Sequence, residues 1–584
     1  MQSDDVLGAI WSPEDGRVSP SDLCHSLVRG AKAKGARVFE QTAVEGILTH
    51  GNTIHGVVAN GTTIKCDTVA LCTGLWSREN SLLTEHAVPV WPCHHYYLLT
   101  EPLSGFEQTL PTLSDHDQSL YIRDDSGGLL VGCFEAHAKA VDPQLIGPHS
   151  PFNLLQEDWD HFEPVMEAAI RRIPALENAG VRTLLNGPES FTPDGNFLLG
   201  ESSMTQGLFL GCGMNSVGLA SAGGAGWALA EAIINDSMPF DLAELDPQRF
   251  HPCFSDIDTL SKRVPEVLGK HYAISYPGRQ WHSTRNLRKL PLDELWRDHS
   301  AIMGQVNGWE RPLYFESKSD THLDIRHTSD ADLTFAMPLW FDNVAEEVAV
   351  TADSVGLFEL STFGRFSFKG NRAQDFLQYL CSNKVNIEPG KCCYSLLLNS
   401  KGGIEFDAVV FRLKEDEFLM SIGSAHVQKA ATWIERCFKQ YSKESLQHLP
   451  ISSENLLIAN HSECTAAIAI AGPGSDSLLS DLCDNFKAPG FFAHHSFNLK
   501  GTEIRVACLS YTGERGFEII CSAKDILAVS RELIAKGASP VGLYAQTSMR
   551  IEKGFSRHKA MSWTPMSPPL MWDLALLLTQ NKHF

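Results

Sequence analysis

The N-terminal part of the chain carries apolar residues at helical spacing. Leu23, Leu27 and Ala31 recur at the spacing of one helix face. Ser19 can cap the start of this helix, and Gly35 can end it in the left-handed conformation. The pattern therefore predicts a helix between Ser19 and Gly35.

Short runs of apolar and β-branched residues follow this helix. Asn60-Gly61 lies between two of the runs and is a strong signal for a tight hairpin turn. We expect strands over residues 37–39, 44–47, 54–59, 62–65 and 68–72.

Two glycine-containing segments come directly after apolar strands. The strand at 68–72 runs into Gly74 and Trp76, and a glycine at a strand end lets backbone approach a ligand closely. Trp76 is equally consistent with a core aromatic residue. The strand at 209–210 leads into a glycine-rich turn and a helix of small residues, which is either a cofactor site at a helix N-terminus or a close helix contact. That turn comprises Gly213, Met214, Asn215, Ser216, Val217 and Gly218.

The second half of the chain alternates again between strand and helix patterns. The pattern becomes less regular from Pro239, and we interpret residues 256–341 as connecting and packing structure between two large units. The pattern then predicts strands over 355–358 and 363–368, a helix over 373–380, and a hairpin of 393–398 with 404–412. These elements predict a multidomain protein of the α/β and α+β classes.

Composition excludes some classes of partner. The chain has 584 residues, which is too many for one core, and a formal net charge of −22 that disfavours nucleic acid and anionic membranes. No apolar run is long enough to span a bilayer, and the start resembles neither a signal nor a transit peptide. The 15 cysteines form no CxxC pair, so we expect free thiols in a reducing compartment and no metal site.

Several segments together resemble the sarcosine and dimethylglycine dehydrogenases, in which an FAD-dependent oxidoreductase is fused to a domain like the aminomethyltransferase of the glycine cleavage system. The resemblance implies a partial FAD-dependent amine oxidoreductase fold over 1–255, the connecting region over 256–341, and an aminomethyltransferase-like folate-binding domain over 342–584. It rests on residues 11–16, 73–79, 186–195, 213–226, 308–312, 398–407 and 511–518.

Two departures from this family pattern stand out. The GxGxxG loop that cradles the FAD pyrophosphate in the family does not occur, nor does the upstream His to which some relatives attach the flavin. The C-terminal tail also drifts from the pattern after Phe555. We therefore expect a chain that is truncated at both ends, incomplete in its folate domain, and weak in FAD binding.

The resemblance implies roles for individual residues in each half. Val44, Gly74, Trp76 and the turn from Gly213 to Gly218 would surround FAD. His95 and Tyr121 would be catalytic and orient the substrate amine, although a buried structural pair is the alternative. In the folate half, Asp407 would be catalytic and contact folate. Tyr511 and Glu518 would lie near the pterin, while Gln546 replaces an Arg of the stand-alone enzymes and leaves the contact to the folate tail uncertain.

The implied function is oxidation of an N-methyl amine, either sarcosine or dimethylglycine, with transfer of the one-carbon unit to tetrahydrofolate. Electrons would pass to an electron-transfer flavoprotein in the mitochondrial matrix. An alternative is a non-catalytic regulatory subunit, because residues 95–100 and 155–164 resemble that of pyruvate dehydrogenase phosphatase and imply its catalytic subunit as partner. A folate-binding scaffold without redox activity is a third possibility.

Overall fold

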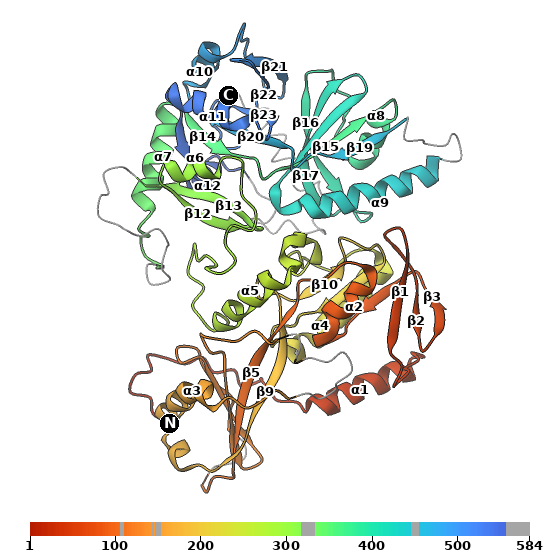
Figure 1. Cartoon of the computed structure of the whole chain (residues 1–584), viewed down its shortest axis with the longest axis vertical. Coiled ribbons are helices and arrows are strands. Elements are labelled where there is room, and N and C mark those ends of the chain that lie inside the picture. The colour runs from red at the N-terminus through yellow and green to blue at the C-terminus, as the bar shows by residue number, and fades with distance from the viewer. Residues whose placement is uncertain (106–109, 143–144, 146–153, 317–332, 446–454, 556–584) are drawn as a thin grey trace. The chain divides into compact units, whose positions relative to one another are not determined.

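The computed structural model describes the chain except for residues 106–109, 143–144, 146–153, 317–332, 446–454 and 556–584 (Figure 1). The predicted drift of the C-terminal tail lies outside the described residues. Two compact units are present: unit 1 comprises Met1–Ile234, Glu244–Pro247 and Phe254–Ile274, and unit 2 comprises Asn235–Ala243, Gln248–Cys253 and Ser275–Phe584. Both units mix helices and sheets, as the sequence predicts. The predicted domain boundaries at residues 255 and 341 stay predictions.

Unit 1 begins with the predicted helix, α1 (Pro20–Ala33). The Ser19 hydroxyl accepts a hydrogen bond of 3.3 Å from the Asp22 amide, which is the expected N-cap. The strands that follow form an antiparallel sheet, with Asn60 and Gly61 at positive φ in the predicted hairpin turn. This sheet consists of β1 (Val44–His50), β2 (Thr53–Ala59) and β3 (Thr62–Lys65).

The strand predicted over residues 37–39 is wrong. These residues adopt no regular structure, and Val38 and Phe39 are exposed at 42% and 62%. A short apolar run becomes a strand only where a neighbouring strand pairs with it, and the described chain supplies no such neighbour here.

A small sheet in unit 1 contains both predicted cofactor strands. β4 (Val69–Leu71) runs parallel to β11 (Leu208–Cys212), which also pairs with β10 (Leu198–Glu201). After β11 the chain turns through the glycine-rich segment into α4 (Gly218–Asn235). Because β4 and β11 are parallel, their carboxyl ends lie at the same edge of the sheet.

A larger antiparallel sheet forms another part of unit 1, in the order β6-β7-β8-β5-β9. Its strands β5 and β9 pair with each other and lie side by side in Figure 1. The helix α3 (Trp159–Arg172) covers one face, where Phe162 and Val165 pack with Tyr96 and Leu98 of the sheet. The strands are β5 (Trp91–Thr100), β6 (Leu113–Asp115), β7 (Leu120–Asp125), β8 (Gly128–Cys133) and β9 (Val181–Phe191). The remaining helices of unit 1 are α2 (Ser77–Ser81) and α5 (Ile257–Gly269).

Unit 2 is built on two large sheets, each with a core of its own, and a further buried cluster that includes Phe411 and Ile520 joins them. The six-stranded sheet packs against α6 (Asp293–Asp298), α10 (Ser475–Leu482) and α11 (Ile526–Ala535). The five-stranded sheet packs against α8 (Ala373–Leu380) and α9 (Val427–Ser445). In order of pairing the first sheet contains β21 (His494–Leu499), β22 (Thr502–Ala507), β23 (Gly516–Ser522), β20 (Thr465–Ala471), β14 (Gly356–Glu359) and β24 (Ser539–Val541). The second contains β16 (Cys392–Leu398), β17 (Ile404–Lys414), β18 (Glu417–Ile422), β15 (Gly364–Lys369) and β19 (Leu457–Asn460).

The helices of unit 2 include the one predicted over 373–380. They are α6 (Asp293–Asp298), α7 (Phe341–Asp353), α8 (Ala373–Leu380), α9 (Val427–Ser445), α10 (Ser475–Leu482), α11 (Ile526–Ala535) and α12 (Leu543–Glu552). In the part of the chain that the structure describes, none of the helices is long and apolar enough to cross a membrane.

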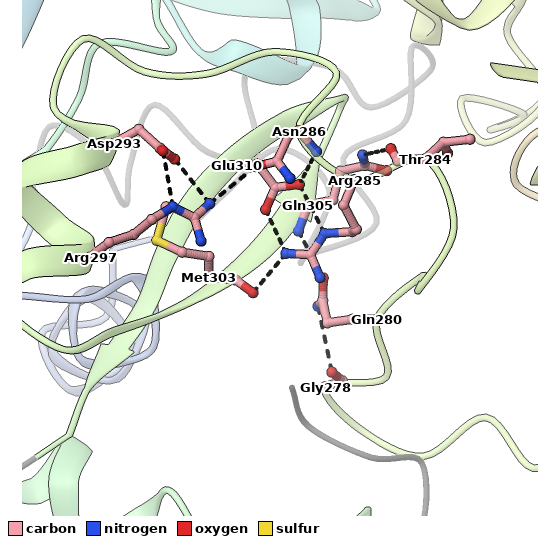
Figure 2. Close-up of polar contacts among 10 residues, drawn as sticks. All are labelled: Gly278, Gln280, Thr284, Arg285, Asn286, Asp293, Arg297, Met303, Gln305 and Glu310. Atoms are coloured by element: carbon pink, nitrogen blue, oxygen red, sulfur yellow. Dashed lines mark hydrogen bonds and ion pairs between the residues drawn. The ribbon is translucent and has the colours of Figure 1, made fainter. Parts of the chain in front are cut away.

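The strands β12 (Ala301–Val306) and β13 (Trp309–Phe315) form a hairpin in unit 2. Hydrogen bonds and an ion pair connect this hairpin to the loop that contains Arg285 and Asn286. The fully buried Glu310 accepts hydrogen bonds of 2.8 and 2.5 Å from Arg285 and one of 2.8 Å from the Asn286 amide (Figure 2). Arg288 lies 3.8 Å from the centroid of the Trp309 ring. Burial alone would raise the pKa of Glu310, but these donors hold it below its ordinary value. A buried ion pair thus stabilises part of the region predicted to be connecting and packing structure.

Candidate functional site

The parallel pair of β4 and β11 brings the two predicted flavin segments to one edge. β4 ends just before Gly74, and β11 ends just before Gly213, and both glycines have positive φ. In sheets of this type ligands bind at the carboxyl ends of parallel strands. Sequence reasoning had placed these segments together only by family resemblance, and the strand pairing supplies the physical reason.

The glycine-rich turn has a strained backbone that hydrogen bonds hold in place. Asn215 and Ser216 both adopt positive φ, at 46° and 68°, although neither is glycine. The Asn215 side chain donates to the Gly213 carbonyl at 2.6 Å and accepts from the Thr192 amide at 2.9 Å. Strain that is fixed in this way is characteristic of ligand-binding positions.

The two glycines at this edge differ in the space beside them. A Cβ at Gly74 would meet nothing within 4 Å, whereas one at Gly213 would lie 2.8 Å from the Thr192 side chain. One side of the turn is thus packed and the other is open. The glycines of α4, Gly223 and Gly224, also have open space beside them in the described chain, which argues against the close-packing alternative. That these residues contact the ring end of an FAD stays a prediction, and the open side at Gly74 is consistent with it.

Trp76 lies close in the chain to this edge, whereas Val44 belongs to a different sheet. Trp76 ends the short helix Gly74–Trp76 and is partly buried. Val44 begins β1 in the separate three-stranded sheet and is 43% exposed. Among the described residues no recorded side-chain contact joins Val44 to the turn, so its role stays a prediction. Met214, Val217 and Gly218 lie within the turn or at the start of α4.

His95 and Tyr121, far apart in sequence, meet on the face of the large sheet opposite α3. His95 lies on β5 and Tyr121 on β7, and Tyr121 Oη is 3.5 Å from His95 Nε2. Their contact depends on Gly132, where a Cβ would lie 2.0 Å from the tyrosine ring. Gly187, opposite His95 on β9, leaves open space beside the imidazole.

Sequence reasoning missed Glu189, which connects this pair to the glycine-rich turn. Glu189 Oε2 accepts a hydrogen bond of 2.8 Å from the Ser216 hydroxyl and lies 3.7 Å from His95 Nε2. The available signal was the period of two along β9, because Glu189 shares a sheet face with Gly187 and therefore with His95.

Aromatic rings close one side of this face. Phe134 lies 5.1 Å from His95 and 4.3 Å from His271 between ring centroids, and Tyr272 follows at 4.6 Å from Phe134. Burial lowers the pKa of His271, and the charges of its histidine neighbours lower it further. Burial also raises the pKa of Tyr121, so its hydroxyl stays protonated at neutral pH. The arrangement is a largely apolar surface with a few polar atoms, which suits a small organic ligand.

In unit 2 the predicted Asp407 has a partner that sequence reasoning did not name. Tyr394 on β16 donates a hydrogen bond of 2.9 Å from its hydroxyl to Asp407 Oδ2 on β17. The two residues are diagonal neighbours on one face, since Tyr394 pairs with Val409. Burial and the charge of Asp407 raise the pKa of Tyr394, as does the nearby Tyr511, which is 39% exposed. The structure thus pairs Asp407 with Tyr394, and Tyr511 lies near enough to raise the pKa of Tyr394.

Glu518 has a different environment on β23. Burial raises the pKa of its carboxyl to about 7, although the charge of Arg365 acts in the opposite direction. Arg365 is itself buried, and burial lowers its pKa to about 10. No direct contact between Glu518 and Asp407 is recorded in the described residues. Gln546 lines a separate small recess with Arg311 and Glu359.

Comparison with known proteins assigns the two halves of the chain to different families. Residues 1–232 match the model of the FAD dependent oxidoreductase family, 235–289 its central domain, and 292–582 the GCVT N-terminal domain. The chain is 32% identical over 587 residues to a 4-methylaminobutanoate oxidase (formaldehyde-forming) of Paenarthrobacter nicotinovorans, covering 99% of this chain and 68% of the relative.

This chain belongs to the sarcosine and dimethylglycine dehydrogenase family. Human mitochondrial sarcosine dehydrogenase is 31% identical over 618 residues, covering 98% of this chain and 66% of that protein. The mitochondrial regulatory subunit of mouse pyruvate dehydrogenase phosphatase is 33% identical over 567 residues, covering 94% and 62%. The predicted family, with an FAD-dependent oxidoreductase followed by an aminomethyltransferase-like domain, is therefore confirmed.

The extent of these matches also bears on the expected truncation. The chain spans 62 to 68% of the length of the three relatives. The matches do not bear out the expectation that both ends are truncated. Among solved structures, the glycine cleavage system aminomethyltransferase T of Bartonella henselae is 23% identical, with a TM-score of 0.36 over 46% of this chain and 63% of that one.

Proposed function

We propose that this family member oxidises an N-methylated amino acid with FAD and transfers the released one-carbon unit to tetrahydrofolate. The observation that carries the first step is the meeting of His95 and Tyr121, with Glu189 connecting them to the glycine-rich turn. Bound flavin would supply the acceptor for a hydride from the carbon next to nitrogen.

The residues of the site support a positioning role for the protein. Tyr121 keeps its proton and can donate a hydrogen bond, while the apolar wall around Phe134 excludes water from the reacting carbon. The amine must be neutral when the hydride leaves, because only a free lone pair can form the C=N bond of the iminium product. His95 and Tyr121 are suited to orienting that lone pair.

The folate step is proposed for unit 2. Asp407, held by Tyr394, and the partly exposed Tyr511 would contact the pterin, and Glu518 would accept hydrogen bonds from its amide and amino edge. A one-carbon unit bound to the substrate nitrogen as an iminium is electrophilic, and a folate amine is the nucleophile that captures it.

The substrate and electron acceptor are narrower proposals. We propose sarcosine, dimethylglycine or 4-methylaminobutanoate as candidate substrates, since relatives named for sarcosine and 4-methylaminobutanoate have nearly equal identity. An electron-transfer flavoprotein is the proposed acceptor if the protein is a dehydrogenase, and oxygen if it is an oxidase. Localisation in the mitochondrial matrix is proposed from the names of the mouse and human relatives.

The weak FAD binding expected from the sequence stays a prediction, so the test uses protein to which FAD is added in excess. This protein is mixed anaerobically with each of the three amines. Loss of the oxidised flavin absorbance is expected with at least one of them, and tetrahydrofolate should then suppress formaldehyde release. The second candidate function is a regulatory subunit, which the 33% identity to that mouse protein favours. If no amine reduces the flavin and the protein alters the activity of a pyruvate dehydrogenase phosphatase catalytic subunit, the regulatory function replaces the enzymatic one.

A further inference from the structure

Glu189 is an anionic group on the proposed substrate face that the roles above do not use. Its side chain is 31% exposed, and the same oxygen, Oε2, faces both Ser216 and His95. In the described parts of the chain, Oε1 accepts no recorded hydrogen bond. One oxygen thus holds the carboxylate in place while the other is available to a ligand.

The neighbours of Glu189 fix its orientation. Ser216 donates to it from a turn that the Asn215 side chain holds in place through hydrogen bonds to Gly213 and Thr192. His95 Nδ1 is buried without a hydrogen-bond partner in the described chain, and its only polar neighbours lie at Nε2. The imidazole proton therefore belongs on Nε2, where it faces Glu189 and Tyr121.

In an amine oxidation the substrate nitrogen is positively charged at two stages. The amine is an ammonium when it arrives from water, and its nitrogen becomes positive again as the hydride leaves and the iminium forms. A fixed carboxylate beside the nitrogen binds the arriving ammonium, which must lose its proton to water before the hydride can leave. As the hydride leaves, the same carboxylate stabilises the positive charge that develops on the nitrogen in the transition state.

We propose that Glu189 is a substrate-binding residue whose carboxylate recognises the cationic nitrogen of the amine, with Ser216 and His95 as positioning residues. This inference rests on the proposed function, because it concerns the same face of the sheet. The Glu189 carboxylate would make the site prefer ligands with a positive charge. The aromatic rings around Phe134 would discriminate between ligands only by their shape.

The test compares two probes that have the same shape and differ in charge. Trimethylammonioacetate has a cationic nitrogen where 3,3-dimethylbutanoate has a carbon, and neither can lose a hydride. Binding to FAD-loaded protein is measured by calorimetry and by perturbation of the flavin spectrum. The unmodified protein should bind the cation at least about tenfold more tightly, and Glu189→Gln should remove most of that preference.

Two further variants separate a local effect from a general one. Glu177→Gln removes one negative charge at an exposed position of the same unit and should leave the preference unchanged. Ser216→Ala keeps the Glu189 carboxylate but removes the hydrogen bond that orients it. The preference for the cationic probe should therefore fall, but by less than in Glu189→Gln. If Glu189→Gln does not fold, as judged by circular dichroism, the Ser216→Ala variant tests the proposal instead. A reduced preference for the cationic probe then supports the role of Glu189, and an unchanged preference overturns it.

The outcomes distinguish this inference from the proposed function. Equal binding of both probes by the unmodified protein, or an unchanged preference in Glu189→Gln, overturns the assignment of Glu189 even if N-methyl amines reduce the flavin. A protein that binds neither probe and is reduced by no N-methyl amine overturns the proposed function, and this inference with it.

Discussion

The Tyr394 hydroxyl donates a hydrogen bond of 2.9 Å to Asp407, from a neighbouring strand of the same sheet. Burial keeps this hydroxyl protonated by raising its pKa, so it remains a donor to the carboxylate at neutral pH. Asp407 itself is partly exposed beyond this bond. The pair therefore presents one oriented carboxylate at the surface where Tyr511 also lies.

Asp407→Ala should weaken tetrahydrofolate binding by at least about tenfold without unfolding unit 2, because a charge-assisted contact to the ligand is lost. Calorimetric titration with 5-formyltetrahydrofolate, a stable analogue, provides the measurement. Tyr394→Phe should give a smaller loss, since the carboxylate remains but is less constrained. Asp416→Ala, at an exposed turn of the same sheet, is the matched control. Unchanged affinity together with unchanged one-carbon transfer would remove Asp407 from the site.

His95→Ala should slow flavin reduction by the best N-methyl amine by about a hundredfold, while FAD stays bound, because the imidazole orients the reacting nitrogen. Stopped-flow absorbance under anaerobic conditions follows the reduction directly. His94→Ala is a close control, because His94 lies 3.0 Å from Asn186 and the alternation of β5 directs it to the opposite face of the sheet. Equal slowing in the two variants would mean that the sheet, not the imidazole, was disturbed.

Folate affinity should depend on pH through Glu518. Burial raises the pKa of this carboxyl to about 7, and only its ionised form accepts both hydrogen bonds from the pterin edge. Binding is then linked to proton release, so affinity should rise with pH up to about 7 and level off above it. Titrations with 5-formyltetrahydrofolate between pH 5.5 and 8.5 would show this. Glu518→Gln should flatten the profile, whereas Glu503→Gln, exposed in the same sheet, should not.

Glu310→Gln should destabilise unit 2 by about 3 kcal/mol, because it breaks a buried ion pair and leaves Arg285 without its carboxylate. Denaturant unfolding monitored by hydrogen exchange in β12 and β13 gives the value for this region. Arg297→Ala removes the more exposed pair with Asp293 and should cost less than about 1 kcal/mol.

The same pair predicts how stability changes with acid. The folded pKa of Glu310 lies below its ordinary value, so the unfolded state takes up a proton first as pH falls. The stabilisation is fully present above the unfolded pKa and is lost as pH falls through the folded one. The difference in stability between unmodified protein and Glu310→Gln should therefore shrink in acid. A difference that is constant with pH would exclude an ionised pair.

The sequence by itself determined the local elements and the family. Ser19 and Asn60-Gly61 act through their immediate neighbours, so a cap and a hairpin turn could be predicted from short patterns. The glycine-rich turn was recognisable for the same reason, since φ requirements are local. Residues 37–39 show the limit, because a strand also needs a partner that no local pattern specifies.

Only the tertiary structure decided which side chains meet. His95, Tyr121 and Glu189 come from three strands, and the order β7-β8-β5-β9 together with the missing side chain of Gly132 brings them to one face. Asp407 was predicted as a site residue from the family resemblance, but its contact with Tyr394 follows from the register of β16 and β17. Strand order and register are set by packing of the whole core, and contacts between distant residues therefore follow from the fold rather than from any segment of the sequence.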